Sequence, residues 1–381
     1  MTATNAPAEA TPRPQSPQSP QGPAGGLTSR LRSITLSSAL VEGRALLALV
    51  LIIAVFALLS DNYLDPGNLV TITKQVAFNA ILALGMLMVI LNGGIDLSVG
   101  STVGLTGAVA GNLFRGLDLP LTQAIMFPQV WVIVVISVGV GALVGYANGL
   151  LISRLRLAPF IVTLGMLYVG RGLTEVLLNG QNITNELRGQ EGLGNTGFFE
   201  VFASRPLGLP ISAWVMIALA VLASILLVRS PFGRWLYASG SNERAAELSG
   251  VPVTRVKTRI YVIAGTCAGI VGLLQIANIS SATADLGQFY ELNAIAAVVI
   301  GGAALSGGRG TVRGTIIGAF VIGFLANGLV IVGVSPFWQQ VITGAVIILA
   351  VAVDRIQQIA QNRGAARRAA AEVRTAASTS S

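Results

Sequence analysis

Long apolar segments recur along most of this 381-residue chain and limit its possible folds more than any other feature. An α-helix needs roughly 20 apolar residues to cross the hydrocarbon core of a bilayer. Only 10% of the residues are charged, against roughly 25% in a soluble domain, so a water-facing surface could not be covered with charge. The sequence therefore predicts an all-α, polytopic transmembrane helical bundle of about ten spans. The spans are predicted at 44–61, 69–91, 99–115, 129–152, 159–178, 211–229, 259–279, 292–305, 311–333 and 336–353.

A short internal repeat refines this bundle. The tetrapeptide ANGL occurs at 147–150 and at 326–329, and a Pro-Phe pair opens the apolar segment after each copy. With alternating spans, the first copy ends an inward-running helix and the second lies in an outward-running one. That arrangement is typical of the inverted-topology repeats of transporters. We therefore predict an inverted-topology internal repeat.

Glycine-rich breaks form a second repeated pattern. GGxxLSxG occurs at 93–100 and again at 301–308. Glycine breaks within membrane helices are tolerated where the backbone lines a cavity or packs closely on a neighbour. The offset between these copies differs from that between the ANGL copies, so one duplication does not explain both. The pattern predicts broken helices at these two places.

The chain divides by composition into three parts. Residues 1–28 form a Pro-, Ser- and Ala-rich segment, which we expect to be a disordered cytoplasmic tail because it has too little apolar surface to bury. Residues 29–354 hold the transmembrane domain, and 355–381 form a basic C-terminal tail. Lys and Arg gather in both tails and in alternate loops, which predicts that both termini are cytoplasmic. The basic residues suit anionic membrane lipid better than nucleic acid.

One cytoplasmic segment is unusually long and polar. The loop at 230–258 is predicted to contain a turn, an N-cap at Ser241 or Asn242 and a short helix over 243–248. Gly250 and Pro252 are predicted to end this helix. Connectors between spans are usually shorter. We therefore expect this loop to dock onto a soluble partner.

Several chemistries are excluded by residues that the sequence lacks. It has no histidine and one cysteine, Cys267, which excludes His-based metal sites, Ser-His or Cys-His nucleophile pairs and an intrachain disulfide. No GxxxxGK[ST] motif is present, so the chain does not bind ATP through a P-loop. We expect a protein that is not an enzyme and that holds no metal or cofactor.

The polar residues within or at the edges of the spans have two possible roles. Asp96 could be a proton or cation site, but the SVGST that follows favours a capping role at the half-helix starting at Leu97. Arg171 and Glu175 are four residues apart and are expected to pair. The amides suit either hydroxyl-rich substrates or hydrogen bonds between helices, the second use being the more common. These amides are Asn79, Asn148, Gln275, Asn278, Asn293, Asn327, Gln339 and Gln340.

Three stretches resemble a known family. GGIDLSVGS at 93–101, PFIVTLGM at 159–166 with Arg171-Gly172 beyond it, and YELNAIAAVVIGGAALSGGRGT at 290–311 are similar to the signature stretches of the ribose/xylose-type sugar ABC transporter permeases. The loop at 233–251 resembles that family's coupling segment. The resemblance covers roughly 44–354.

The resemblance implies a permease subunit of a binding-protein-dependent importer in a bacterial inner membrane, translocating a monosaccharide such as ribose or xylose. Its partners would be a cytoplasmic ATP-binding subunit, an extracytoplasmic sugar-binding protein and a second permease copy, either identical or a paralogue. The residues carried over as the coupling segment are Gly240, Asn242, Glu243, Ala246, Leu248, Ser249 and Gly250.

Within this interpretation we expect alternating access along a central path. The expected lining residues are Asp96, Ser98, Asn148, Phe160, Thr163, Asn327 and Phe337. The alternative is an ion-coupled secondary sugar transporter that uses Asp96 as its coupling carboxylate. That alternative shares the inverted repeat but gives no reason for the docking helix.

Overall fold

The computed structural model describes residues 26–119, 124–184, 198–349 and 352. Residues 1–40 and 41–381 are separate units, and of the first the structure describes only the opening of α1 (Gly26–Leu59). The predicted tails at 1–28 and 355–381 therefore lie outside the described residues, except that Gly26 already begins α1.

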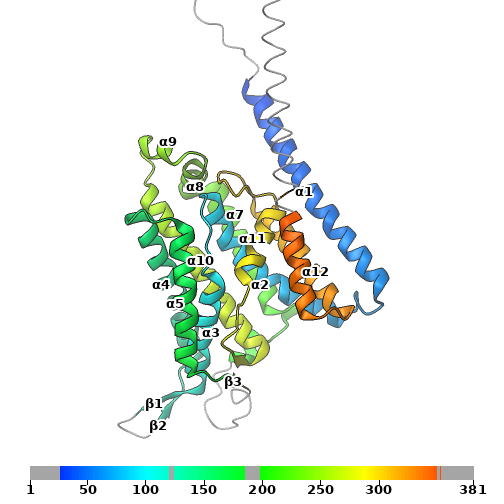
Figure 1. Ribbon diagram of the computed structural model, residues 1–381, viewed down its shortest axis with the longest axis vertical. Coiled ribbons are helices and arrows are strands. Elements are labelled where there is room, and N and C mark those ends of the chain that lie inside the picture. The colour runs from blue at the N-terminus through cyan, green and yellow to red at the C-terminus, as the bar shows by residue number, and fades with distance from the viewer. Residues whose placement is uncertain (1–25, 120–123, 185–197, 350–351, 353–381) are drawn as a thin grey trace, which may run out of the picture. The chain divides into compact units, whose positions relative to one another are not determined.

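Helices fill nearly all of the described chain, and a helix lies in each of the ten predicted ranges (Figure 1). The chain is all-α and polytopic. After α1 the long helices are α2 (Pro66–Leu91), α3 (Val99–Arg115), α4 (Val130–Arg154), α5 (Pro159–Leu178), α7 (Ile211–Arg229), α10 (Val253–Ile279), α12 (Val312–Ile331) and a helix at Pro336–Leu349. The short ones are α6 (Phe198–Phe202), α8 (Pro231–Ser241), α9 (Glu243–Leu248) and α11 (Tyr290–Ile300), with a 3-10 turn at Pro206–Gly208.

Two short antiparallel ladders lie at the end of the bundle opposite α8 and α9 (Figure 1). In the first, β1 (Leu117–Leu119) pairs with β2 (Ala124–Met126) as a local hairpin. In the second, β3 (Ile183–Thr184) pairs with β4 (Ser281–Ala282), so that Ile183 lies opposite Ala282. The second ladder joins the segment after α5 to the segment after α10.

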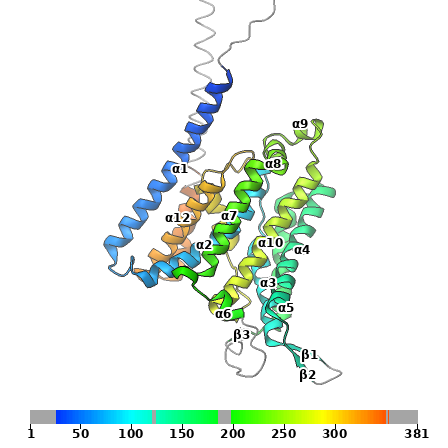
Figure 2. The ribbon, with the colours of Figure 1, turned by 180° about the vertical axis from the view of Figure 1, so that it is seen from behind.

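The helices pack in two groups, which meet at the contact between α2 and α10 (Figure 2). One group contains α3, α4, α5 and α10, and the other contains α2, α7, α11 and α12, with α10 packing on α2. Both central helices are buried along most of their length, as expected of helices that are apolar on every face. The core of the molecule therefore runs along α2 and α10.

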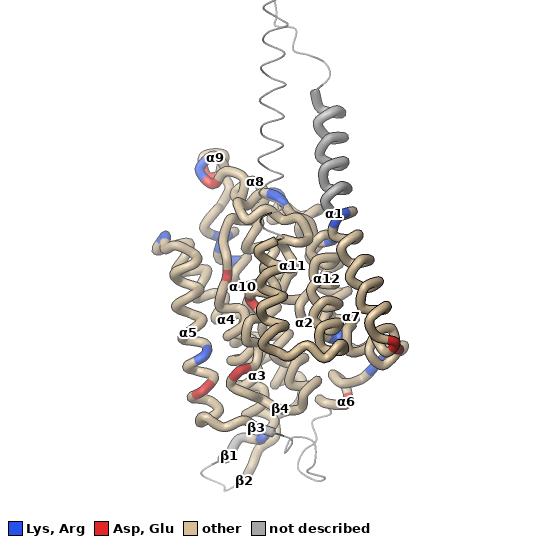
Figure 3. The backbone as a smooth tube through the Cα atoms, turned by 45° about the vertical axis from the view of Figure 1, so that its right-hand side comes forward, with Lys and Arg blue, Asp and Glu red and all other residues tan. Residues whose placement is uncertain are grey.

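The outer helices expose large apolar side chains. Trp131 of α4, Tyr168 of α5 and Val228 of α7 are 64%, 72% and 76% exposed. Six helices in the described part of the chain are long and apolar enough to cross a bilayer: α2, α4, α5, α7, α10 and α12. Charged positions gather toward the helix ends, notably at α8 and α9, and most of the tube between is uncharged (Figure 3). The chain is a multi-pass membrane protein.

Two predicted boundaries are wrong. The range 292–305 was expected to span, but α11 has 11 residues and rises about 16 Å, short of the roughly 30 Å hydrocarbon core. Turns at 284–289 precede it and turns from 301 follow it, so this element is a broken helix. Residues 238–241 were expected as a turn but form the last turn of α8. That helix begins at Pro231, and Ser230 caps its start by accepting from Gly233 N–H at 3.2 Å.

The two ANGL copies lie in helices that run in opposite directions. The end of α4 lies beside the start of α10, where the hydroxyls of Ser153 and Thr258 are 3.0 Å apart. The segment that leads into α12 lies beside α8, where Gly308 N–H donates to the Leu91 carbonyl at 2.8 Å. Thus α4 ends, and α12 begins, at the α8–α9 end. This is the antiparallel arrangement that an inverted repeat requires.

Candidate functional site

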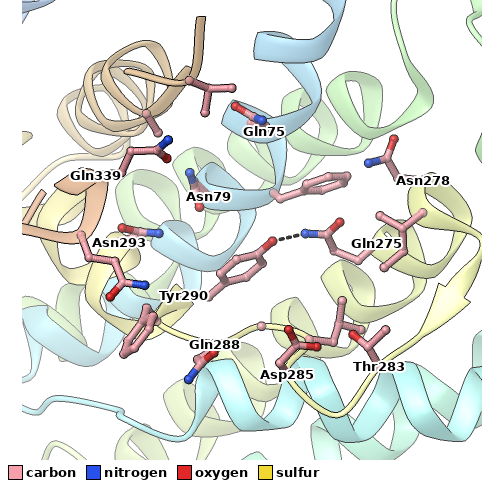
Figure 4. A pocket seen from close by; sticks show the side chains of 18 residues that line it. Gln75, Asn79, Gln275, Asn278, Thr283, Asp285, Gln288, Tyr290, Asn293 and Gln339 are labelled. Atoms are coloured by element: carbon pink, nitrogen blue, oxygen red, sulfur yellow. Dashed lines mark hydrogen bonds between the residues drawn. The ribbon is translucent and has the colours of Figure 1, made fainter. Parts of the chain in front are cut away.

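A cavity of about 550 Å³ lies at the end of the bundle far from α8 and α9. Its walls are the first half of α2, the last turns of α10 and α12, the start of α11, the loop before it and the helix at 336–349. The volume is within the range of small-molecule sites. Figure 4 shows the side chains of Asn79, Gln275, Tyr290 and Asn293 pointing toward one another across it.

Carboxamides dominate the polar lining of this cavity. They are Gln75, Asn79, Gln275, Asn278, Gln288, Asn293, Gln339 and Gln340. The Gln275 amide donates to the Tyr290 hydroxyl, but no hydrogen bond to a described residue is made by the side chains of Gln75, Asn79, Gln288 or Asn293. Each amide can both donate and accept. The cavity can therefore offer paired donors and acceptors to a ligand rich in hydroxyl groups.

Helix periodicity places these side chains together. Gln75 and Asn79 are four residues apart on α2, so they share one face, and Gln275 and Ile279 do the same on α10. Six of the eight amides were predicted from the sequence as polar membrane residues, but none was predicted to line the translocation path. The four-residue spacing within α2 and within α10 could have indicated a shared polar face on each helix.

The lining contains little charge. Asp285 is the one charged side chain among the lining residues, and no Lys or Arg is present. Phe78, Phe289 and Tyr290 add aromatic surface. Within the described residues, no three His, Cys, Asp or Glu side chains gather as metal ligands would. The arrangement suits an uncharged ligand with polar edges and an apolar face.

At the opposite end, α8 and α9 form a helical hairpin exposed beyond the bundle. The predicted helix over 243–248 is confirmed as α9, and Asn242 is its N-cap, accepting from Ala245 N–H at 3.0 Å. Ala246 is buried, whereas Leu248 is 76% exposed. Ser249 caps the last turn through the Ala245 carbonyl, and Gly250 leaves the helix at a positive φ of 84°.

An ion pair holds this hairpin onto α10. Lys257 Nζ lies 2.7 and 2.8 Å from the two carboxylate oxygens of Glu243. Both side chains are partly exposed, so the pair orients α9 more than it stabilises it.

The last turn of α8 is packed directly against the two glycine-rich breaks. Gly240 leaves no room for a Cβ against the Leu91 carbonyl oxygen, and a methyl group there would lie 2.9 Å from Gly308 N. Asn92 donates to the Ser239 hydroxyl at 2.8 Å. The last turn of α8 therefore contacts both the end of α2 and the segment between α11 and α12.

A tyrosine on α8 adds a further contact with the second break. The Tyr237 hydroxyl donates to the Gly310 carbonyl at 2.8 Å. Burial raises the pKa of Tyr237, which keeps the phenol protonated as the donor.

Comparison with known proteins identifies the chain. Residues 68–351 match the family described as branched-chain amino acid transport system permease component. The chain belongs to this permease family. It is 40% identical to the ribose import permease protein RbsC of Escherichia coli K12 over 84% of this chain and 95% of that protein. It is 43% identical to RbsC of Bacillus subtilis 168, over 81% and 91%, and 36% identical to the fructose import permease protein FrcC of Rhizobium meliloti, over 81% and 84%. No solved structure matches the chain.

Three residues of the predicted path form one buried cluster in this permease. Asp96 Oδ1 accepts from Ser98 N–H at 2.9 Å and from the Ser98 hydroxyl at 2.6 Å, and Asn148 donates to that hydroxyl at 2.8 Å. Each is at most 1% exposed. The carboxylate meets a free backbone N–H as expected, but the helix begins at Val99 and Asp96 binds the N-cap residue Ser98. This cluster does not line the cavity.

The other path residues of the permease are dispersed. Thr163 is buried and lies within 3.2 Å of the Ile95 carbonyl, beside the cluster. Asn327 exchanges two hydrogen bonds of 3.0 Å with Asn68 on α2. Phe160 and Phe337 are 54% and 80% exposed on the surface of the chain. The structure thus brings four of the seven residues together, and none of the seven lines the cavity.

The expected pairing of Arg171 with Glu175 is wrong. The structure records no ion pair between these two described residues. Arg171 Nη1 donates instead to the carbonyls of Ala284 and Leu286, at 3.0 and 2.7 Å.

Proposed function

We propose that this chain is the membrane-spanning subunit of a bacterial ABC importer, and that it translocates a monosaccharide, a pentose such as ribose or xylose, across the inner membrane. The observation that carries the proposal is the cavity lined by eight carboxamides and three aromatic rings. Sugars offer hydroxyl groups that need both donors and acceptors, and apolar ring faces that stack on aromatic side chains. The relatives named as ribose and fructose import permeases support this substrate class.

The family's description names branched-chain amino acids, a class of cargo with different requirements. A zwitterionic amino acid carries a carboxylate and an ammonium group, and burying either without an opposite charge is costly. The cavity offers Asp285 toward an ammonium but no Lys or Arg toward a carboxylate. A neutral sugar fits this lining better.

The partners follow from the two ends of the molecule. We assign the α8–α9 hairpin to a cytoplasmic ATP-binding subunit and the cavity end to an extracytoplasmic sugar-binding protein, with a second permease copy beside this one in the lipid bilayer. We also propose that both termini are cytoplasmic, as the distribution of Lys and Arg predicts. The contacting residues in the hairpin would be Gly240, Asn242, Glu243, Ala246, Leu248, Ser249 and Gly250.

Energy would reach the cavity through backbone contacts. Closure of the ATPase would push α9 and α8, and Gly240 would pass the movement to Leu91 and Gly308. The first half of α2 lines the cavity, and the end of α2 contacts α8. A displacement of α2 would therefore move the cavity wall and the α8 contact together.

A transport assay in proteoliposomes tests the proposal. The permease, its partner ATPase and the binding protein are reconstituted and supplied with labelled ribose, xylose, galactose or leucine. We expect ATP-dependent uptake of a sugar and no uptake of leucine. Uptake of leucine alone would overturn the substrate class, and sugar uptake that persists without ATP and collapses with a proton uncoupler would favour the ion-coupled alternative using Asp96.

The coupling assignment has its own test. Combining Glu243→Lys with Gly250→Pro breaks the ion pair to Lys257 and the end of α9. We expect ATP hydrolysis to become independent of sugar and uptake to fall at least about tenfold, since several contacts of about 1 kcal/mol each are lost. Gly172→Ala, on α5 where a methyl group has open space, is the control. Normal uptake by the double variant would contradict the assignment of the α8–α9 hairpin as the docking surface for the ATP-binding subunit.

A further inference from the structure

One wall of the cavity is a loop without regular secondary structure. Between β4 and α11 the chain makes successive turns over 284–289, and Thr283, Asp285 and Gln288 line the cavity. Gly287 and Phe289 both have positive φ, of 74° and 63°. A non-glycine residue in that conformation persists only where its surroundings hold it. This wall loop, residues 283–289, therefore depends on contacts made from outside it.

Arg171 donates two hydrogen bonds to the backbone of this wall loop, and Asn182 accepts a longer one from Ala284 N–H at 3.4 Å. Arg171 Nη1 donates to the carbonyls of both Ala284 and Leu286. Arg171 lies on α5, which contributes no residue to the cavity lining. The guanidinium therefore acts on the wall loop from outside the lining and cannot itself be a ligand in the cavity as the structure stands.

The packing around this contact is close. Gly104 of α3 lies against both partners, because a methyl group there would be 2.9 Å from the Leu286 carbonyl oxygen and 3.2 Å from Arg171 Nη1. The charge of Arg171 interacts with that of Glu291, the second residue of α11. Glu291 is buried, and its Oε2 has no hydrogen-bond partner among the described residues. An uncompensated charge would be costly here, so the two opposite charges favour each other, although they form no direct ion pair among the described residues.

We propose that Arg171 is a positioning residue for the cargo cavity: by holding the carbonyls of Ala284 and Leu286 it fixes the wall loop 283–289 and sets the affinity of the cavity for its ligand. The inference rests on the proposed function insofar as the ligand is a sugar. The hydrogen bonds are charge-assisted, and such bonds are among the stronger ones in proteins. Without them the wall loop loses its link to α5, and Gln288 and Asp285 lose their fixed positions in the lining.

Cysteine labelling tests the proposal independently of transport. Cys267, the one native cysteine, is buried in α10, so Gln288→Cys places a single accessible thiol on the wall loop. In the reconstituted complex, its rate of reaction with a membrane-impermeant thiol reagent is measured without and with Arg171→Met. We expect Arg171→Met to raise the rate about tenfold, as loss of charge-assisted hydrogen bonds releases the loop. Gly172→Ala, the neighbouring position with open space around it, should leave the rate unchanged.

Two further variants keep the test decisive if Arg171→Met fails to fold. Arg171→Lys keeps the charge but replaces the fork of donors with one ammonium, and should give an intermediate rate. Gly104→Ala wedges a methyl group between the Leu286 carbonyl and Arg171, and should raise the rate in the same direction. Labelling rates equal to that of Gln288→Cys alone in both variants would overturn the proposal.

Transport and protection separate this proposal from the proposed function. Arg171→Lys should raise KM for sugar several-fold while Vmax changes less, because the binding wall and not the energy supply is altered. A fall in Vmax alone would show a merely structural role and count against the proposal. Protection of Gln288→Cys by ribose or xylose tests the cavity as the sugar site. Faster labelling in Arg171→Met without sugar protection would sustain the positioning role and reject the assignment of the cargo.

Discussion

Two polar regions lie within the apolar core, and they differ in how their hydrogen bonds are used. In the cluster of Asp96, Ser98 and Asn148, the bonds run among the three side chains, and each residue is at most 1% exposed. In the cavity, the amides of Gln75, Asn79, Gln288 and Asn293 make no bond to a described residue and face an open volume. The first region pairs most of its polar groups internally, although Asn148 Oδ1 has no partner among the described residues. The second keeps them available.

The contrast shows that polarity within a membrane protein does not by itself mark a transport path. A buried polar group is tolerated when a partner satisfies it, and the partner can be another residue of the same chain. Asp96 has such a partner in Ser98, so its conformation is explained without a ligand. The amides of Gln75, Asn79, Gln288 and Asn293 in the cavity have no such partner among the described residues. This difference predicts that changes in the cluster alter stability and changes in the cavity alter affinity for cargo.

The largest effect is expected for Asp96→Ala. It leaves the Ser98 N–H and hydroxyl buried without an acceptor, which should lower the free energy of unfolding by about 3 kcal/mol. Asp96→Asn keeps one carbonyl acceptor and should lose about half as much. Thermal unfolding in detergent measures both. If Asp96→Asn abolished uptake while unfolding at the parent temperature, the cluster would be part of the transport chemistry and the comparison would fail.

A cavity variant should show the opposite pattern. Replacing both Asn79 and Asn293 with Leu removes two amides that make no bond to a described residue, so stability should change little. The KM for sugar should rise about tenfold or more, at about 1 kcal/mol for each lost hydrogen bond to cargo. Initial uptake rates over a range of sugar concentrations give this value. An unchanged KM would show that the cavity is not on the path.

The reciprocal pair of Asn68 and Asn327 extends the comparison to the second ANGL copy. Because each amide satisfies the other, a double-mutant cycle with Ala should give a coupling free energy of about 1 kcal/mol in unfolding and no change in KM. Val221→Ala, at a 54% exposed position of α7 that does not line the cavity, serves as a control outside the pair. A coupling free energy near zero combined with a raised KM would show that Asn327 lies on the translocation path and is not satisfied by Asn68.

The smallest effects are expected at the exposed phenylalanines. Phe337→Leu and Phe160→Leu alter side chains that are 80% and 54% exposed, so the free energy of unfolding should change by no more than about 0.5 kcal/mol. Uptake by these variants should match that of the parent. A clear loss of uptake with unchanged unfolding would sharpen the comparison by placing these residues on a path completed by the second copy.

The positions of the helices, including the short helix α9 and its cap, could be read from the sequence, because local signals determine them. Apolar length predicted the spans, and Asn242, Gly250 and Pro252 predicted where α9 begins and ends. The shortness of α11 was less visible, since the residues that follow it, at 301–305, are also apolar enough to extend a predicted span. Arg171 shows the limit of local reasoning. Spacing along one helix pointed to Glu175, whereas the acceptors lie more than 100 residues away.

By itself the sequence determined that this protein is a multi-pass helical membrane protein, because apolar length, scarce charge and the glycine breaks are properties of each segment alone. It also supplied the amides, but not which of them face a common space. Only the tertiary structure decided that Asn79, Gln275 and Asn293 meet across one cavity while Asn148 and Asn327 bond to neighbouring helices. The physical reason is that a buried amide is satisfied by whatever lies opposite it, and the packing of separate helices decides what that is.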